Sequence, residues 1–304
     1  MTAPQADRHR ITAGPLAATI QAAGAELVSL RDRAGAEYLW QAGPAWRRHA
    51  PLLFPIVGRL ANDTLRHGGR SYRMTQHGFA RDRRFAWVAR AADRCRLRLV
   101  DDAESRALYP FAFQLEVEYR IEGGRLAVRS QIANTGKAPL PCSFGAHPAF
   151  RWPLVEGAPK DAHRLTFAQA ETGPSLRLEA GLLGDPEPNP VSGRELALKE
   201  DLFARDALIL PGIASRALRY AAPDGTALLM EWEGYTDLGL WSKPEGAGFL
   251  CIEPWSGMSS PRGWDGEFAD KPGLLHIAPN ARRDFTWTIE IKHGGAAPIP
   301  PPGG

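Results

Sequence analysis

One stretch of the chain, Phe113–Glu122, alternates strictly between apolar and polar side chains. Its apolar positions are Phe113, Leu115, Val117, Tyr119 and Ile121. Because successive side chains of a β-strand point to opposite faces, this pattern predicts a strand with one face in a core and the other in water. Gly123-Gly124 follows directly and indicates a tight hairpin turn. The alternation resumes from Leu126 to Ile132, which predicts the returning antiparallel strand.

Shorter alternating runs recur at Cys95–Val100, Ala227–Trp232 and Phe285–Lys292, separated by turns rich in Gly, Pro, Asn and Asp. Helical periodicity is confined to Asp101–Leu108, where we expect one short helix that stops before Pro110. Many short strands and almost no helix predict an all-β sandwich or barrel. The chain has no strand–helix–strand rhythm and no Gly-rich phosphate loop, which disfavours the nucleotide-binding α/β folds.

The composition agrees with a globular protein that has a large core. Of the 304 residues, 44% are hydrophobic and 23% are charged. No linker or internal repeat is visible, so we predict a single domain over residues 1–293. The tail 294–304 is Gly- and Pro-rich and too poor in apolar side chains to pack, so we expect it to be disordered. The segment 156–190 is rich in Pro, Gly and Glu and is expected to hold long loops.

Charge and targeting signals limit the partners. The net charge is +3, with Lys and Arg spread along the chain, which favours neither a nucleic-acid partner nor a membrane surface. The N-terminus lacks an apolar segment of signal-peptide length, and no later run is long enough to span a bilayer. The cysteines Cys95, Cys142 and Cys251 are odd in number and far apart, as is typical of reduced thiols. We expect a cytoplasmic protein, either a monomer or a homodimer.

Two ionisable residues stand in settings that can change their chemistry. His147 lies between Gly145, which allows close approach of a ligand, and Pro148, which favours an extended backbone. Its imidazole could donate a proton near neutral pH. Glu253 ends the apolar run that starts at Phe249, and partial desolvation would raise its pKa and make it a better general base. The alternatives are a histidine satisfied by a carbonyl and a strand-end glutamate that points to water.

Further polar and aromatic side chains are candidates for binding a ligand. His77, in a turn, could bind a hydroxyl group or cap the turn. The guanidinium groups of Arg59 and Arg81 could each donate bidentate hydrogen bonds to sugar hydroxyls or a carboxylate, or form surface salt bridges. The tryptophans that could stack on a sugar are Trp40, Trp46, Trp152, Trp241, Trp255 and Trp264. Trp255 is favoured because it adjoins Glu253. These residue types by themselves leave the reaction open.

Five short motifs resemble the aldose 1-epimerase (galactose mutarotase-like) family, most closely its LacX-like branch. The motifs are Glu37–Trp40, Pro51–Leu60, His77–Arg81, Gly145–Phe150 and Cys251–Trp255, and they occur in the family's order. The similarity covers nearly the whole chain. It implies a large antiparallel β-supersandwich that binds a sugar. It also implies interconversion of the α and β anomers of an aldohexose, with no cofactor and no metal.

The resemblance further implies roles for individual residues. Glu253 lies where the family has its general base, and His147 lies where it has its general acid. The positions implied to bind the sugar's oxygens are His77, Arg59 and Asp206. After the Glu-Pro-Trp motif, Ser256–Ser260 departs from the aromatic residue and aspartate that the family often carries there. A different pocket rim is therefore expected.

Three other functions are compatible with the same fold or residue types. A hexose-6-phosphate mutarotase would need a cationic phosphate pocket, for which the candidates are Arg81, Arg83, Arg84 and Arg151. A non-catalytic carbohydrate-binding or sensing protein on the same fold would need no acid–base pair. A glycoside hydrolase would use two carboxylates. Mutarotation is favoured because it needs an acid and a base beside adjacent oxygens of one pyranose. We therefore expect Glu253 and His147 to face each other across a pocket of that size.

Overall fold

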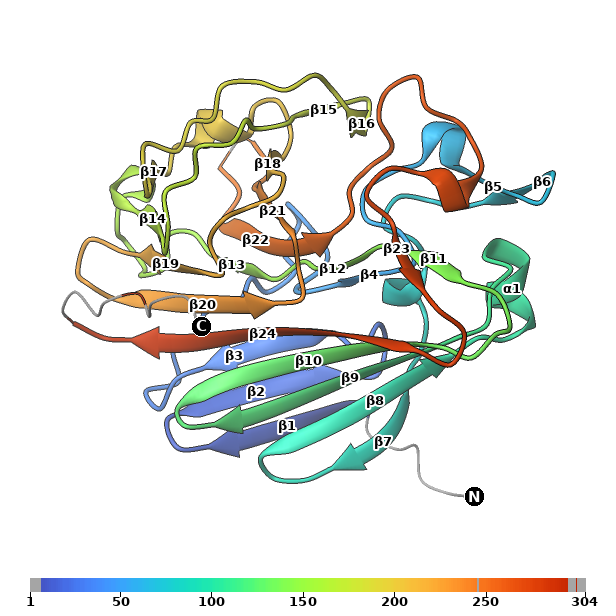
Figure 1. The fold of residues 1–304 in the computed structure, drawn as a ribbon. Helices are drawn as coiled ribbons and strands as arrows, with labels where there is room; N and C mark the ends of the chain where they lie inside the picture. Colours follow the sequence, from blue (N-terminus) through green and yellow to red (C-terminus); the bar gives the residue numbers. More distant parts are fainter. Residues whose placement is uncertain (1–6, 245, 295–298, 300–304) are drawn as a thin grey trace.

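The computed structural model describes residues 7–244, 246–294 and 299, and almost all of the predicted disordered tail, 294–304, lies outside them. The described residues form antiparallel sheets, which confirms the predicted all-β class (Figure 1). Their single α-helix is α1 (Ala103–Leu108). It starts two residues later than predicted, because Asp102 caps it and exchanges hydrogen bonds with Ser105. The short 3-10 turns are η1 (Ala61–Asp63), η2 (Ala80–Asp82), η3 (Lys160–Ala162), η4 (Glu200–Phe203) and η5 (Phe268–Asp270).

The larger of the two main sheets has nine strands and contains every alternating run read from the sequence. Its order is β17 (Glu195–Ala197), β14 (Arg164–Phe167), β19 (Ala217–Ala221), β20 (Ala227–Glu233), β24 (Arg282–Lys292), β10 (Arg125–Asn134), β9 (Phe113–Glu122), β8 (Arg94–Val100) and β7 (Ala86–Arg90). The predicted hairpin is confirmed, because β9 and β10 pair from Arg125 opposite Glu122. Both turn glycines between them have the positive φ that the turn requires.

The second main sheet has six short strands and no alternation in most of them. Its strands are β18 (Leu208–Leu210), β21 (Asp237–Trp241), β22 (Phe249–Ser256), β12 (Phe144–Ala146) and β4 (Leu52–Leu53), with β13 (Ala149–Arg151) paired to the first half of β22. All eight residues of β22 are buried. A strand covered on both faces gives a continuous apolar run rather than an alternating one.

Smaller sheets complete the molecule. They are β1 (Arg8–Ala13), β2 (Leu16–Gln21) and β3 (Leu27–Arg31); β5 (Thr64–His67) and β6 (Arg70–Arg73); β11 (Leu140–Cys142) and β23 (Leu275–Ile277); and β15 (Leu178–Glu179) and β16 (Leu182–Leu183). The β1–β3 sheet lies against β8 and β9 (Figure 1). There the Tyr119 hydroxyl donates a buried 2.7 Å hydrogen bond to the Ala25 carbonyl. The main core therefore lies on the apolar face of the nine-stranded sheet.

Loops fill most of one long segment, and all three cysteines are buried. The segment 156–190 contains only η3, β14, β15 and β16, and loops make up most of the rest, as predicted. Cys95, Cys142 and Cys251 are all buried and unpaired. Among the described residues, no helix has both the length and the apolar character needed to cross a bilayer.

Candidate active site

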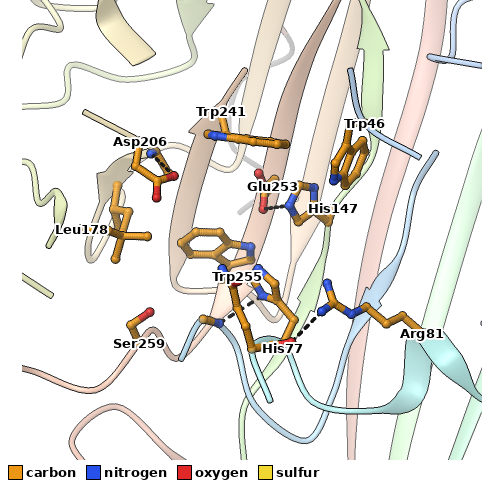
Figure 2. Close-up of a pocket in the computed structure, with 14 residues that line it drawn as sticks. Trp46, His77, Arg81, His147, Leu178, Asp206, Trp241, Glu253, Trp255 and Ser259 are labelled. Atoms are coloured by element: carbon orange, nitrogen blue, oxygen red, sulfur yellow. Dashed lines mark hydrogen bonds and ion pairs between the residues drawn. The ribbon is translucent and has the colours of Figure 1, made fainter. Parts of the chain in front are cut away.

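A pocket of about 270 Å³ opens beside the six-stranded sheet, and the two proposed acid–base residues lie in its wall (Figure 2). Six of the seven residues predicted from the sequence as site residues line it. They are Glu253, His147, His77, Arg81, Asp206 and Trp255. The seventh, Arg59, is not among the lining residues.

The register of the six-stranded sheet explains why His147 meets Glu253. Gly145 in β12 pairs with Trp255, and Ala149 in β13 pairs with Cys251, both on β22. Halfway between these pairs, His147 falls opposite Glu253. A side chain at position 145 is excluded, because its Cβ would lie 2.7 Å from the Trp255 indole. Glycine therefore lets β12 approach β22 closely enough for this pairing.

The two groups are closer than expected. His147 Nε2 lies 3.1 Å from a carboxylate oxygen of Glu253, and both side chains are almost wholly buried. The expectation that they face each other across the width of a pyranose is therefore wrong. They stand side by side in one wall (Figure 2). This arrangement still suits a hemiacetal, because its ring oxygen and anomeric hydroxyl are bonded to the same carbon.

Burial changes the proton affinity of both groups. Loss of water contact raises the pKa of Glu253 well above its usual 4.5, and the charge of Asp206 raises it further. Burial also lowers the pKa of His147 to about 3. In the free site the imidazole is therefore neutral at pH 7, in contrast to the expected protonated histidine. Both shifts favour the uncharged forms, a carboxylic acid on Glu253 and a neutral imidazole on His147.

Aromatic rings enclose the imidazole of His147. Trp46 stacks on it with ring centroids 5.0 Å apart, and Trp241 meets it edge-on at 6.0 Å. Trp46 is outside the strands, but the Trp40 indole donates a 2.8 Å hydrogen bond to its carbonyl. Both Trp46 and Trp241 line the pocket, so two further members of the tryptophan set belong to the site. Trp40, Trp152 and Trp264 are not lining residues.

Trp255, the tryptophan favoured from the sequence, lies flat against the sheet. Its indole passes over Gly239 of β21, where an added Cβ would come within 2.4 Å of the ring. The glycines at positions 145 and 239 thus leave room for one large ring on the pocket floor. A sugar could lay its apolar face on such a surface.

His77 is oriented by its own turn. Its Nδ1 accepts a 3.1 Å hydrogen bond from the Gly58 N–H, which places the proton of a neutral imidazole on Nε2. Burial lowers the pKa of His77 well below 6.5. The ring stands edge-on to His147, with centroids 5.7 Å apart. His77 is therefore a neutral hydrogen-bond donor beside the acid–base pair.

The two predicted binding arginines behave differently. Arg81 donates a 2.7 Å hydrogen bond to the Gln76 carbonyl, and burial lowers its pKa to about 10, so it stays charged. Arg59 instead forms two hydrogen bonds with Asp63, from Nε at 2.7 Å and from a terminal nitrogen at 3.1 Å. Its fork is occupied by a carboxylate outside the pocket lining, so the structure does not place Arg59 where sugar oxygens would bind.

Asp206 lies across the pocket from His147 (Figure 2). It follows η4 in a tight turn with φ of 68°, a conformation that Asp tolerates better than most residues. One carboxylate oxygen caps this turn by accepting a 2.8 Å hydrogen bond from the Ala207 N–H. The other oxygen has no hydrogen-bond partner among the described residues and can accept one from a ligand hydroxyl.

Sequence reasoning assigned no binding role to six lining residues, which are Gly58, Gln76, Leu178, Ala207, Ile209 and Ser259. Ser259 belongs to the segment that departs from the family pattern. Its hydroxyl accepts a 3.0 Å hydrogen bond from the Arg59 N–H. The altered segment thus contributes one residue to the pocket lining. Leu178 lies in β15 and Ile209 in β18, and no local sequence signal marks them because tertiary packing brings them to the pocket.

One cluster of possible metal ligands exists among the described residues. It consists of His147, Cys251 and Glu253, whose ligand atoms lie within 4.8 Å of one another. Two of its members are the acid–base pair. Cys251 lies two residues before Glu253 and therefore shares its face of β22.

Comparisons with known proteins show the family and the fold of this chain. The sequence model of the aldose 1-epimerase family matches residues 7–190. The chromosomal protein LacX of Lactococcus lactis subsp. lactis is 33% identical over 281 residues, which cover 88% of this chain and 94% of LacX. The galactose mutarotase related enzyme of Lactobacillus acidophilus has a TM-score of 0.87 at 28% identity, over 94% of this chain and 97% of that one. A galactose mutarotase-like protein of Lactobacillus casei has the same score and identity, over 94% and 100%.

Proposed function

This chain belongs to the aldose 1-epimerase family, and we propose that it is a mutarotase that interconverts the α and β anomers of a free aldohexose. The observation that carries the proposal is the buried contact between Glu253 and His147 in the pocket wall. A sugar-binding site needs hydrogen-bond donors and acceptors, but it has no need for a carboxyl group and an imidazole in contact and withdrawn from water.

The mechanism needs one proton shared by two groups. Ring opening removes the proton of the anomeric hydroxyl and delivers a proton to the ring oxygen. With a sugar bound, we propose that the proton of Glu253 passes to His147 over their 3.1 Å contact. Glu253 then removes the hydroxyl proton while His147 protonates the ring oxygen. Rotation about the C1–C2 bond turns the aldehyde, and the reversed transfers close the ring and return the proton to Glu253.

The remaining lining residues would hold the sugar. We assign the apolar face of the pyranose to the Trp255 indole and its hydroxyl groups to His77, Arg81 and Asp206. A free sugar is favoured over a phosphorylated one, because of the four arginines considered for a phosphate only Arg81 lines the pocket. Arg83 pairs with Asp102 and Glu104. Arg84 pairs with Asp7. The fourth arginine, Arg151, also lies outside the pocket lining.

The test is NMR exchange between sugar anomers over a panel of free and 6-phosphorylated aldohexoses. Wild-type protein should accelerate exchange of at least one free sugar, and Glu253→Gln should lower that rate by about 10²–10⁴-fold because one acid–base group is lost. Sugar binding, followed by tryptophan fluorescence, should remain. The matched control is Glu118→Gln on the water face of β9, which should exchange anomers at the wild-type rate.

Two results would contradict the proposal. Wild-type turnover by Glu253→Gln would exclude Glu253 as the base. Binding without accelerated exchange by the wild-type protein would favour the non-catalytic carbohydrate-binding function. We also propose a cytoplasmic location, which the three buried unpaired thiols support.

A further inference from the structure

We propose that His147, Cys251 and Glu253 form a binding site for a zinc-class divalent ion that inhibits the enzyme by occupying its acid–base pair. The inhibition rests on the proposed function, whereas the metal site itself does not. The three side chains supply one imidazole nitrogen, one thiol sulfur and one carboxylate oxygen, all within 4.8 Å of one another. Three protein ligands with a fourth position open to a pocket are a common zinc arrangement.

The distance between the first two ligands already suits a metal. His147 Nε2 and the Glu253 oxygen lie 3.1 Å apart. Zinc bonds to N and O of about 2.0–2.1 Å would close this gap with an angle of about 100°, close to tetrahedral. The ion would therefore replace the direct contact with little movement of either side chain. Both atoms belong to groups that line the pocket, so the ion has a path from solvent.

Cys251 decides which ion is preferred. It lies beside Glu253 on the same face of β22, in a small apolar cluster with Phe249 and Ala149. Trp46 and Trp241 pack against this cluster. Soft thiolate and borderline imidazole ligands select Zn²⁺ or Cd²⁺ over Mg²⁺, which prefers oxygen and water. Burial favours the protonated forms of Cys251 and Glu253, so the ion must displace both protons to solvent when it binds. The two negative charges that result neutralise the ion, as a buried site requires.

Two buried polar atoms in the wall lack a well-formed hydrogen bond. The Glu253 oxygen meets His147 Nε2 at 3.1 Å, but this contact does not have hydrogen-bond geometry, and His147 Nδ1 makes no hydrogen bond to any described residue. A buried carboxylate oxygen with only this contact is poorly compensated for its lost water. A metal bond to this oxygen would provide that compensation. An ion held there would block proton transfer and cover the position of the anomeric carbon.

Cadmium binding tests the site without any activity measurement. Titration of metal-free protein with Cd²⁺ should produce the ultraviolet charge-transfer band of a cadmium–thiolate bond with one ion per chain. Cys251→Ser should lose the band and bind Cd²⁺ about 10-fold or more weakly, since the thiolate is the ligand that favours this ion. The matched control is Cys142→Ser, a buried free thiol in β11, which should keep both. Circular dichroism checks that each variant is folded, and Cys251→Ala replaces Cys251→Ser if the latter is not.

Several outcomes would overturn the site. They are the absence of a thiolate band from the wild type, a thiolate band retained by Cys251→Ser, and displacement of Cd²⁺ by Mg²⁺ at equal concentration. Activity then separates the two proposals. Zn²⁺ should inhibit wild-type anomer exchange at the concentration at which it binds. Cys251→Ser should still exchange anomers, and it should require about 10-fold more Zn²⁺ for the same inhibition. Cadmium binding without any exchange activity would refute the proposed function alone. Exchange activity without cadmium binding would refute the metal site alone.

Discussion

The two main sheets of this protein use their charged residues in opposite ways. In the nine-stranded sheet, β9 buries its odd-numbered side chains and leaves Glu116 and Glu118 on the face toward water, near Arg96 and Arg98 of β8. In the six-stranded sheet, β22 is buried on both faces and still carries Glu253. The first arrangement costs little free energy, whereas the second strips a carboxyl group of water.

The two sheets therefore differ in whether their charged residues can take part in catalysis. Surface charges of the nine-stranded sheet are solvated and contribute little to stability or to catalysis. Of the buried acidic and basic residues, Glu253, Asp237 of β21 and Lys271 lie in or beside the six-stranded sheet, whereas Glu26 and Glu171 lie elsewhere. Asp237 accepts a 2.9 Å hydrogen bond from the Gly212 N–H, and Lys271 donates a 2.7 Å hydrogen bond to the Met258 carbonyl. Burial shifts the pKa values of Glu253, His147 and His77 in one pocket, and perturbed ionisable groups collected in one place are typical of active sites. Five substitutions probe this comparison.

The largest effect is expected from His147→Asn in the six-stranded sheet. Asparagine keeps a polar side chain of similar size but cannot exchange a proton, so anomer exchange should fall by about 10²–10⁴-fold. The midpoint of urea unfolding should change little by comparison, since the substitution removes a single polar contact, that of Nε2 with Glu253, and leaves the strands on either side in place. Exchange rates by NMR and unfolding by fluorescence measure the two quantities. Wild-type anomer exchange by His147→Asn would show that this residue of the six-stranded sheet does not carry the chemistry.

The opposite result is expected from Leu115→Ala in β9. Leu115 is wholly buried in the main core. Its truncation should lower the free energy of unfolding by about 2–5 kcal/mol through lost transfer energy and the cavity left behind. The anomer exchange rate per folded molecule should equal that of the wild type. A loss of exchange in the folded fraction would show that the nine-stranded sheet also controls the chemistry.

Lys271→Met tests the buried charges through pH. Burial lowers the pKa of Lys271 from 10.5 to about 8. Above pH 8 the folded state has released the proton while the unfolded chain still holds it, so wild-type stability should rise with pH up to about 10.5. The rise relative to Lys271→Met should approach about 3 kcal/mol, and it should be absent below pH 8. Urea unfolding at pH 7, 8.5 and 10 measures the difference. A constant difference would show that Lys271 keeps its ordinary pKa.

The smallest effect separates the two arginines. Arg81→Ala should raise KM by about 10-fold or more, because a hydrogen bond from a charged group contributes about 1.5–3 kcal/mol. Arg59→Ala should leave KM unchanged, since its guanidinium is occupied by Asp63. Steady-state kinetics on the preferred sugar decide between them. A raised KM for Arg59→Ala alone would restore the role implied by family resemblance and remove that of Arg81.

The strands predicted from the sequence are those of the nine-stranded sheet, which has one face toward water. The alternation of Phe113–Glu122, the Gly123-Gly124 turn and the run that follows correspond to β9, its hairpin and β10. The six-stranded sheet offered no such pattern, because strands buried on both faces read as plain apolar runs. Its strand pairs also join segments far apart in the chain, such as β12 with β22. Local periodicity carries no information about such partners.

The amino-acid sequence was enough to predict the all-β class, the family and six residues that line the pocket. Three features required the folded chain: the contact of Glu253 with His147, the pairing of Arg59 with Asp63, and the enclosure of the imidazole by Trp46 and Trp241. The two kinds of feature differ in the sequence separation over which they act. Hydrophobic alternation and turn residues act over a few neighbouring positions. The pKa of a buried acid and the partner of an arginine depend on atoms that folding brings from distant parts of the chain.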